Sequence, residues 1–101
     1  MTDMERGRRE TLRWALLAAL NFARPLGASE TVLRAAIGDE TPGLTLMELR
    51  RELAYLADRR LVALESKHTP VWSAALTRDG VDLVEYTVPC EPGIARPEKY
   101  W

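Results

Sequence analysis

Few side chains in this chain are suited to covalent chemistry. Among 101 residues there is one histidine, His68, and one cysteine, Cys90. A nucleophilic thiol needs a positioned base, and His68 is the only imidazole that could serve as one. The sequence shows no glycine-rich phosphate loop, supported carboxylate pair or metal-ligand cluster. We therefore expect no enzyme activity, no cofactor and no metal site.

Arginines are the remaining candidates, because they bind phosphate. A cluster near the N-terminus comprises Arg6, Arg8, Arg9 and Arg13. It could form a phosphate-contacting arm of a DNA-binding protein, with Arg8 and Arg9 as contacts. Alternatively, these arginines are solvated or paired with Glu5 and Glu10. Since the formal net charge is −1, any binding of nucleic acid must depend on local patches.

Helical spacing and turn residues indicate the elements that would position these side chains. We expect helices over about 3–23, 29–38, 45–60 and 76–86, and two antiparallel strands over 61–66 and 71–76. Ser29, Thr45 and Thr77 are suitable N-caps. Gly38 is expected to end the second helix in the left-handed conformation.

The stretch "GLTLMELRRELAYLADRRLVALES" has the strongest local signals. Thr45 with Glu48 forms a capping box, and Leu44 with Leu49 has the spacing of a hydrophobic staple. The residues expected to point away from the leucine stripe are Met47, Glu48, Arg51, Glu52, Tyr55, Asp58 and Arg59. This mixed-charge face either contacts DNA or is solvated, with Glu48 and Arg51 as a surface ion pair.

The first helix is apolar on two sides, so it must be covered on both. Its second stripe contains Trp14, Leu17 and Ala18 beside Asn21, and it forms either a dimer interface or a shelf for the tail. The tail has three prolines in 15 residues, which predicts an extended path packed on its own domain or on a partner. We thus divide the chain into a domain over 1–86 and a tail over 87–101.

This order of elements resembles the winged helix-turn-helix domain of ArsR-, MarR- and PadR-like bacterial regulators. The resemblance covers about residues 10–86. It depends on three features of the sequence. These are the leucine spacing from Leu49 onward, the position of "LVALES" immediately after the capped helix, and the motif "ALTRDG". The tail "EPGIARPEKYW" is similar to small uncharacterised proteins of Mu-like phages and prophages.

The resemblance implies an α+β, mostly helical fold with a three-helix core, a β-hairpin wing, a short C-terminal helix and an extended tail. It implies that the third helix enters the major groove of DNA. By position, the groove-facing residues are Thr45, Met47, Glu48, Arg51 and Tyr55. Lys67 and His68 would lie at the tip of the wing, although His68 could equally be a solvated turn residue. A homodimer through Trp14, Leu17, Ala18 and Asn21 would suit such regulators.

Two functions stay open. The first is a DNA-binding transcription regulator or phage-encoded accessory factor. The alternative is a winged-helix module that binds protein and not DNA, an interpretation that the near-neutral charge favours. The longest apolar run, "WALLAAL", is too short to cross a bilayer, and with a single cysteine we expect a cytoplasmic protein.

Overall fold

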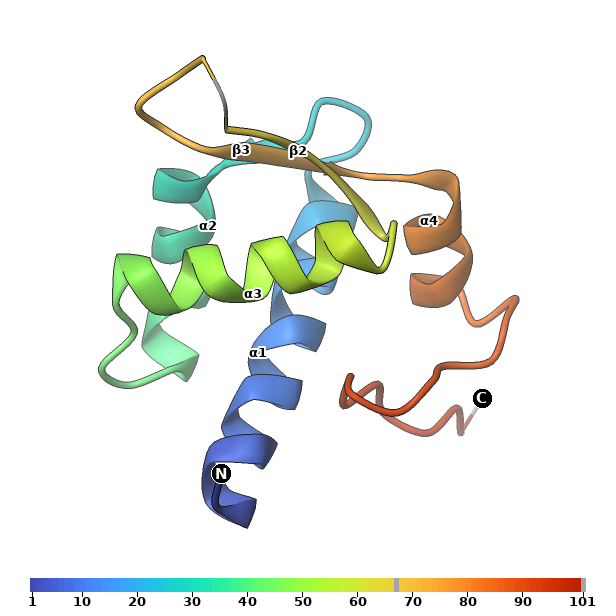
Figure 1. The fold of residues 1–101 in the computed structure, drawn as a ribbon. Coiled ribbons are helices and arrows are strands. Elements are labelled where there is room, and N and C mark those ends of the chain that lie inside the picture. The colour runs from blue at the N-terminus through green and yellow to red at the C-terminus, as the bar shows by residue number, and fades with distance from the viewer. Residues whose placement is uncertain (67, 101) are drawn as a thin grey trace.

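The computed structural model describes residues 1–66 and 68–100, which form an α+β fold with a three-stranded antiparallel sheet (Figure 1). The helices are α1 (Asp3–Phe22), α2 (Glu30–Ile37), α3 (Leu46–Asp58), α4 (Arg78–Val84) and a 3-10 turn, η1 (Gly38–Glu40). The strands are β1 (Ala28–Ser29), β2 (Val62–Glu65) and β3 (Ser73–Leu76). The helix, helix, helix, hairpin, helix order that the sequence predicts is confirmed.

Hydroxyl side chains begin the four α-helices in the described part of the chain. Thr2, Ser29, Thr45 and Thr77 each accept a hydrogen bond from the backbone N–H three residues further on, at 3.1–3.2 Å. Each bond satisfies one of the N–H groups that a helix leaves without a partner in its first turn. The predicted caps at Ser29, Thr45 and Thr77 are confirmed.

The end of α2 differs from the prediction. Gly38 has φ −62° and ψ −37°, which is right-handed, and the chain continues through η1 rather than reversing there. The Thr41 N–H donates to the Gly38 carbonyl at 3.2 Å and closes this tighter turn. In the connection between α2 and α3, the residue with a left-handed conformation is Gly43, with φ +74°. The chain reverses direction there, just before α3.

The sheet has the order β1-β3-β2, with β3 in the centre. β2 and β3 form the predicted hairpin, in register from Val62 opposite Leu76 to Glu65 opposite Ser73. The short strand β1 adds Ala28 opposite Ala74 on the other side of β3. Nothing in the local sequence predicts β1, since a two-residue strand is defined only by its partner.

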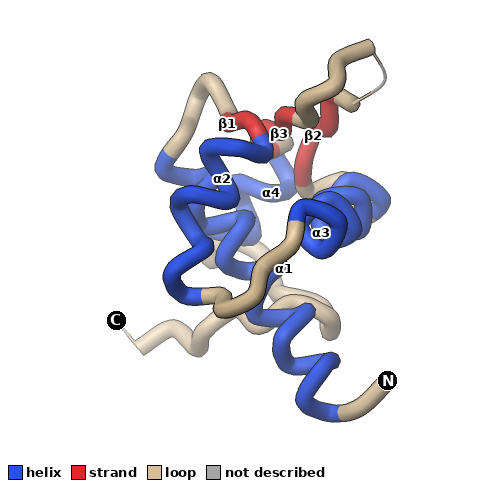
Figure 2. The backbone as a smooth tube through the Cα atoms, turned by 90° about the vertical axis from the view of Figure 1, so that its left-hand side faces the viewer, coloured by secondary structure: helices blue, strands red, loops and turns tan. Residues whose placement is uncertain are grey.

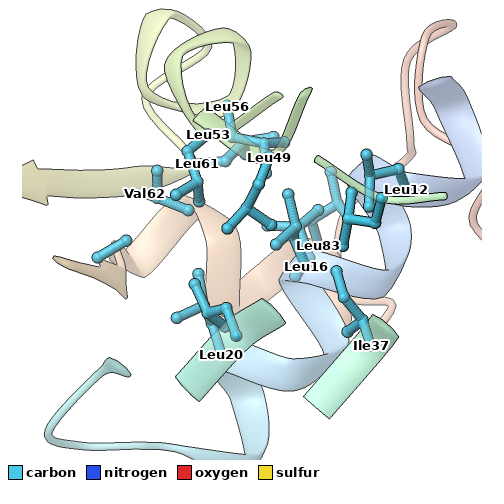
Figure 3. Close-up of a cluster of buried hydrophobic side chains, with 14 residues drawn as sticks. Leu12, Leu16, Leu20, Ile37, Leu49, Leu53, Leu56, Leu61, Val62 and Leu83 are labelled. Carbon is cyan, nitrogen blue, oxygen red and sulfur yellow. The ribbon is translucent and has the colours of Figure 1, made fainter. Parts of the chain in front are cut away.

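The core is formed mainly by leucines from α1, α3 and the start of the hairpin (Figure 3). α1 contacts α2, α3, α4 and β3, so both of its apolar sides pack in part against the same chain, while Ala18 lines a surface groove beside α2. Leu17 is 0% exposed and belongs to this core. Its assignment to a dimer interface is therefore wrong, because it offers no surface to a partner.

Within the described residues, the tail contacts its own domain. The Ala95 N–H donates to the Glu10 carbonyl at 3.1 Å, and the Tyr86 hydroxyl donates to the Pro97 carbonyl at 2.7 Å. Arg96 donates to the Leu83 carbonyl of α4 at 2.9 Å. In both views the tail lies beside the middle of α1 (Figures 1 and 2).

None of the helices in the described ranges is long and apolar enough to span a membrane.

Candidate nucleic-acid interface

The candidate interface is centred on α3, which lies at one side of the molecule next to the hairpin (Figure 2). Its inner face is formed by Leu49, Leu53 and Leu56, each fully buried. On its outer face Met47 is 83% exposed, and Arg51 and Asp58 are also exposed. The helix therefore offers a solvent-facing surface. This surface contains only some of the residues that the sequence predicts for it.

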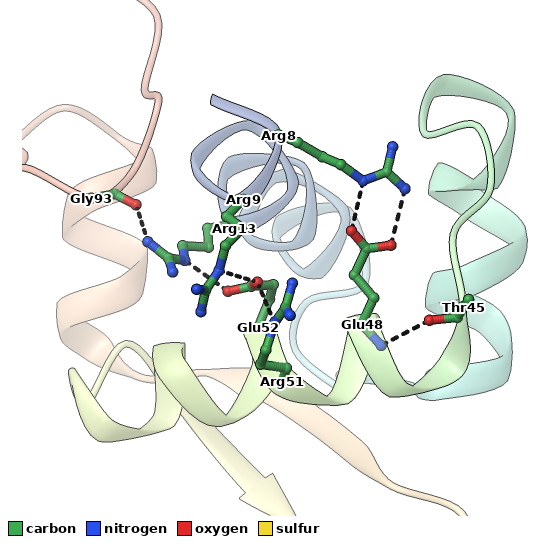
Figure 4. Close-up of polar contacts among 8 residues, drawn as sticks. All are labelled: Arg8, Arg9, Arg13, Thr45, Glu48, Arg51, Glu52 and Gly93. Atoms are coloured by element: carbon green, nitrogen blue, oxygen red, sulfur yellow. Dashed lines mark hydrogen bonds and ion pairs between the residues drawn. The ribbon is translucent and has the colours of Figure 1, made fainter. Parts of the chain in front are cut away.

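Glu52 is the largest departure from the predicted outer face. Its side chain is 0% exposed and accepts hydrogen bonds from three arginines (Figure 4). Arg13 Nε lies 2.8 Å and Arg9 Nε 2.9 Å from its carboxylate oxygens, and Arg51 Nε lies 3.1 Å away. The prediction that Glu52 points to solvent is wrong, because it joins α3 to α1 through buried charge-assisted bonds.

Glu48 makes a second connection to α1, since its two carboxylate oxygens accept from Arg8 at 2.6 and 2.9 Å. The predicted Glu48–Arg51 ion pair is therefore wrong. The bidentate bond to Arg8 lowers the pKa of Glu48 below its ordinary value, with a smaller contribution from the Thr45 backbone. The alternative pairing of the N-terminal arginines with Glu5 and Glu10 is wrong for Arg8 and Arg9, which bind α3 instead.

Tyr55 is covered from the side of α1 and the tail. The Arg13 guanidinium carbon lies 3.5 Å from the centre of its ring, and that of Arg59 lies 4.9 Å away. Arg13 also donates to the Gly93 carbonyl of the tail at 2.8 Å, and a side chain at Gly93 would collide with the Tyr55 hydroxyl. Tyr55 is thus part of the packing between α3 and the tail.

A hollow of about 450 Å³ lies between α2, the start of α3 and the loop of the hairpin. Arg34 and Arg50 line it together with Leu46 and Val71. Arg50 binds the buried carboxylate of Glu30 at 2.6–3.0 Å and lies over the ring of Trp72 at 4.9 Å. This pairing lowers the pKa of Glu30.

Arg34 differs from Arg50 in whether its charge is paired with a carboxylate. It is exposed and donates to the Leu44 carbonyl at 3.3 Å. Among the residues that the structure describes, no carboxylate lies within ion-pair distance of it. Its positive charge is therefore available to a phosphate, and sequence reasoning missed it because Arg34 is an isolated arginine on a short helix.

The hairpin loop contributes His68, which is exposed. The other predicted wing-tip residue, Lys67, lies outside the described residues. Thr45 is exposed at the N-terminus of α3, where its hydroxyl accepts from the Glu48 N–H. The structure therefore brings Thr45, Met47 and Arg51 onto one side of α3, whereas it places Glu48, Tyr55, Arg8 and Arg9 in contacts within the molecule.

The remaining predicted interface residues lie on α1. Trp14 is half-buried and packs edge-on against Tyr86, with ring centres 6.3 Å apart, and it also lines the groove between α1 and α2. Ala18 lines a surface groove between α1 and α2. The Asn21 side chain accepts from Arg24 at 3.2 Å.

The side chains that bear on metal binding are the histidine, cysteine and acidic residues within 1–66 and 68–100. No group of three or more histidine, cysteine or acidic side chains there could hold a metal ion. The Cys90 thiol is half-buried and lies 3.6–3.7 Å from the carbonyls of Glu91 and Ile94.

Comparison with known proteins gives no further assignment: the chain matches no family model, and no curated protein or solved structure is significantly similar to it.

Proposed function

We propose that this protein is a winged helix-turn-helix protein that binds duplex DNA with α3 and the β2–β3 hairpin, as a transcription regulator or a phage-encoded accessory factor. The observation that carries the proposal is the solvent-facing side of a capped α3, which packs against both α2 and β2 of the hairpin (Figure 1). In a winged helix, these three elements face the groove and the backbone of DNA.

The contacts differ from those that the family resemblance implies. Arg51 is the candidate base contact, since its side chain is 52% exposed and arginine reads guanine in the major groove. Arg34 is the candidate phosphate contact. The N-terminus of α3, with the Thr45 hydroxyl, suits a second phosphate. Arg8, Arg9, Glu48 and Tyr55 act indirectly, by fixing the orientation of α3 on α1.

A specific observation favours the second candidate, a winged-helix module that binds protein without DNA. Of the arginines that the sequence assigned to DNA, Arg8 and Arg9 are paired with carboxylates of α3, and Arg51 shares Glu52. Their charges are largely compensated within the molecule, which weakens the electrostatic term that supplies most of non-specific DNA affinity.

A mobility-shift titration with mixed-sequence duplex DNA distinguishes the two candidates. At low salt the electrostatic attraction to phosphate is strongest, so the DNA-binding protein should shift the duplex there and release it as salt is added. The protein-binding module should not shift the duplex at any salt concentration.

A further inference from the structure

The C-terminal end of α3, the helix α4 and the tail surround a pocket that the proposed DNA interface does not use (Figure 1). The pocket has a volume of about 250 Å³. Much of its wall is apolar: Leu61 and Leu83 are buried side chains, and Ile94, Val88 and Pro89 line it from the tail. Pockets for drug-sized ligands typically measure about 300–1,000 Å³. This pocket is therefore suited to a smaller organic molecule, such as a single ring with a short chain.

Three carboxylates and one guanidinium also line the pocket. Asp79 and Asp82 belong to α4 and Glu91 to the tail, whereas Arg59 directly follows α3. Arg59 Nη1 lies 3.5 Å from the Glu91 carboxylate, so these two charges compensate each other. Among residues 1–66 and 68–100, no cationic side chain lies within ion-pair distance of Asp79 or Asp82. The pocket thus combines an apolar wall with two negative charges that have no counter-charge.

The spacing of Asp79 and Asp82 concentrates these charges. Residues three apart are neighbours on a helix surface, where like charges repel each other. Asp82 is half-buried, and solvent screens partly buried charges less than exposed ones. A cation bound beside both carboxylates would relieve this repulsion.

From this combination we infer that the pocket binds a small organic amine. Its protonated nitrogen would lie beside Asp79 and Asp82, and its apolar part would contact Leu61, Leu83 and Ile94. An inorganic cation would leave the apolar wall in water, and a neutral molecule would leave both carboxylates without a counter-charge. The inference does not rest on DNA binding, because none of the proposed DNA contacts lines this pocket.

An NMR titration of the full chain with phenethylamine, followed through the methyl signals, tests this inference. The amine is protonated at pH 7, and the molecule has one ring and a short chain. We expect a Kd of about 1 mM, which is ordinary for a ligand of this size. The shifted signals should belong to the methyl groups that line the pocket, those of Leu61, Leu83, Val88 and Ile94. Phenethyl alcohol, which has the same shape without the charge, should bind at least about tenfold more weakly.

Removing the two carboxylate charges tests the assigned contacts. Asp79→Asn combined with Asp82→Asn should raise the Kd of phenethylamine at least about tenfold, because the amides keep the side-chain size but lose both charge-assisted bonds. Asp39→Asn combined with Asp58→Asn is the matched control. It removes the same charge from two exposed positions outside the pocket, so the Kd should stay within about twofold of the wild-type value.

Four results would overturn the inference. The first is the absence of saturable shifts up to about 10 mM phenethylamine, tenfold above the expected Kd. The second is equal binding of phenethyl alcohol by the wild type, which needs no variant to fold. The third is a folded Asp79→Asn, Asp82→Asn variant that binds as tightly as the control. The fourth is Mg²⁺ shifting the same methyl signals as phenethylamine, since the site would then recognise charge alone.

Discussion

The Glu52 carboxylate of α3 accepts a hydrogen bond from Arg13 of α1 at 2.8 Å, in a site where the Glu52 side chain has no exposed surface (Figure 4). Arg13 continues to the Gly93 carbonyl of the tail. One buried acid and one arginine thus connect the candidate interface helix, the central helix and the C-terminal segment. The orientation of α3 depends on this connection.

Glu52→Gln should strongly destabilise the fold. The amide preserves the shape but leaves Arg9 and Arg13 without a compensating charge, and breaking a buried ion pair in this way costs about 3–5 kcal/mol. Urea denaturation measures the loss of free energy of unfolding. Glu48→Gln is the comparison, and it should cost less because Arg8 is more exposed than Arg13. Equal losses would show that burial of Glu52 is not what matters.

Acid should remove stability supplied by Glu30. Its bond to Arg50 lowers the pKa of this carboxyl below its ordinary value of 4.5 in the folded state. A lowered folded pKa means that the stabilisation is complete above pH 4.5 and is lost as pH falls through the folded pKa. Wild type and Glu30→Gln should therefore differ most in free energy of unfolding at pH 7, and the difference should shrink in acid. A difference that does not change with pH would contradict this.

The sequence predicts features whose cause lies within a few residues. Thr45 and Glu48 are three apart, and the cap they form needs no information from the rest of the chain. Glu52 could not be placed in the same way, because its partners Arg9 and Arg13 belong to another helix. A signal was nevertheless present: Arg9 and Arg13 are one turn apart on α1, and Glu52 lies between leucines on the edge of the buried stripe.

Other misassignments have the same physical origin. Leu17 belongs to a second apolar stripe, and the sequence alone does not tell whether such a stripe is covered by a partner or by the same chain. Here α2, α4 and the sheet surround α1. The strand β1 is defined by its pairing with β3, and a glycine such as Gly38 permits but does not require a left-handed turn.

Gly80→Ala should destabilise the protein despite the higher helix propensity of alanine. A Cβ atom at Gly80 would overlap the Leu61 carbonyl oxygen, so α4 would have to move away from the start of the hairpin, at a cost of about 1–3 kcal/mol. Thermal or urea unfolding measures this loss. Gly38→Ala is the control, since Gly38 is right-handed and a Cβ there meets no atom within 4 Å. It should be neutral or stabilising; the opposite ranking would show that α4 packs differently.

Gly93→Val should release the tail from α3. The φ angle of Gly93 is +113°, and a side chain there would collide with the Tyr55 hydroxyl. Local opening should make the half-buried Cys90 thiol react about tenfold faster with a disulfide reagent, which corresponds to about 1.4 kcal/mol of opening free energy. Gly7→Ala, on the open side of α1, should leave the labelling rate unchanged. Unaltered labelling in Gly93→Val would show that the tail is not held at this point.

The proposed DNA interface predicts which arginines carry the salt dependence of binding. Arg34 would contact a phosphate and Arg51 a base edge, so replacing both with alanine should lower affinity, and the loss of the phosphate contact should reduce the slope of log K against log salt concentration by about 1. Arg78→Ala, an exposed arginine at the start of α4 and outside α2, α3 and the hairpin, is the control and should preserve both the affinity and the slope.

The most direct measurement is the fluorescence anisotropy of a labelled mixed-sequence duplex titrated with the wild-type protein and with the Arg34→Ala, Arg51→Ala double variant over a series of salt concentrations. We predict that the wild type binds at about 50 mM salt, that affinity falls steadily as salt increases, and that the double variant binds more weakly with a shallower slope. No anisotropy change at low salt, or a double variant that matches the wild type, would contradict DNA binding through α3.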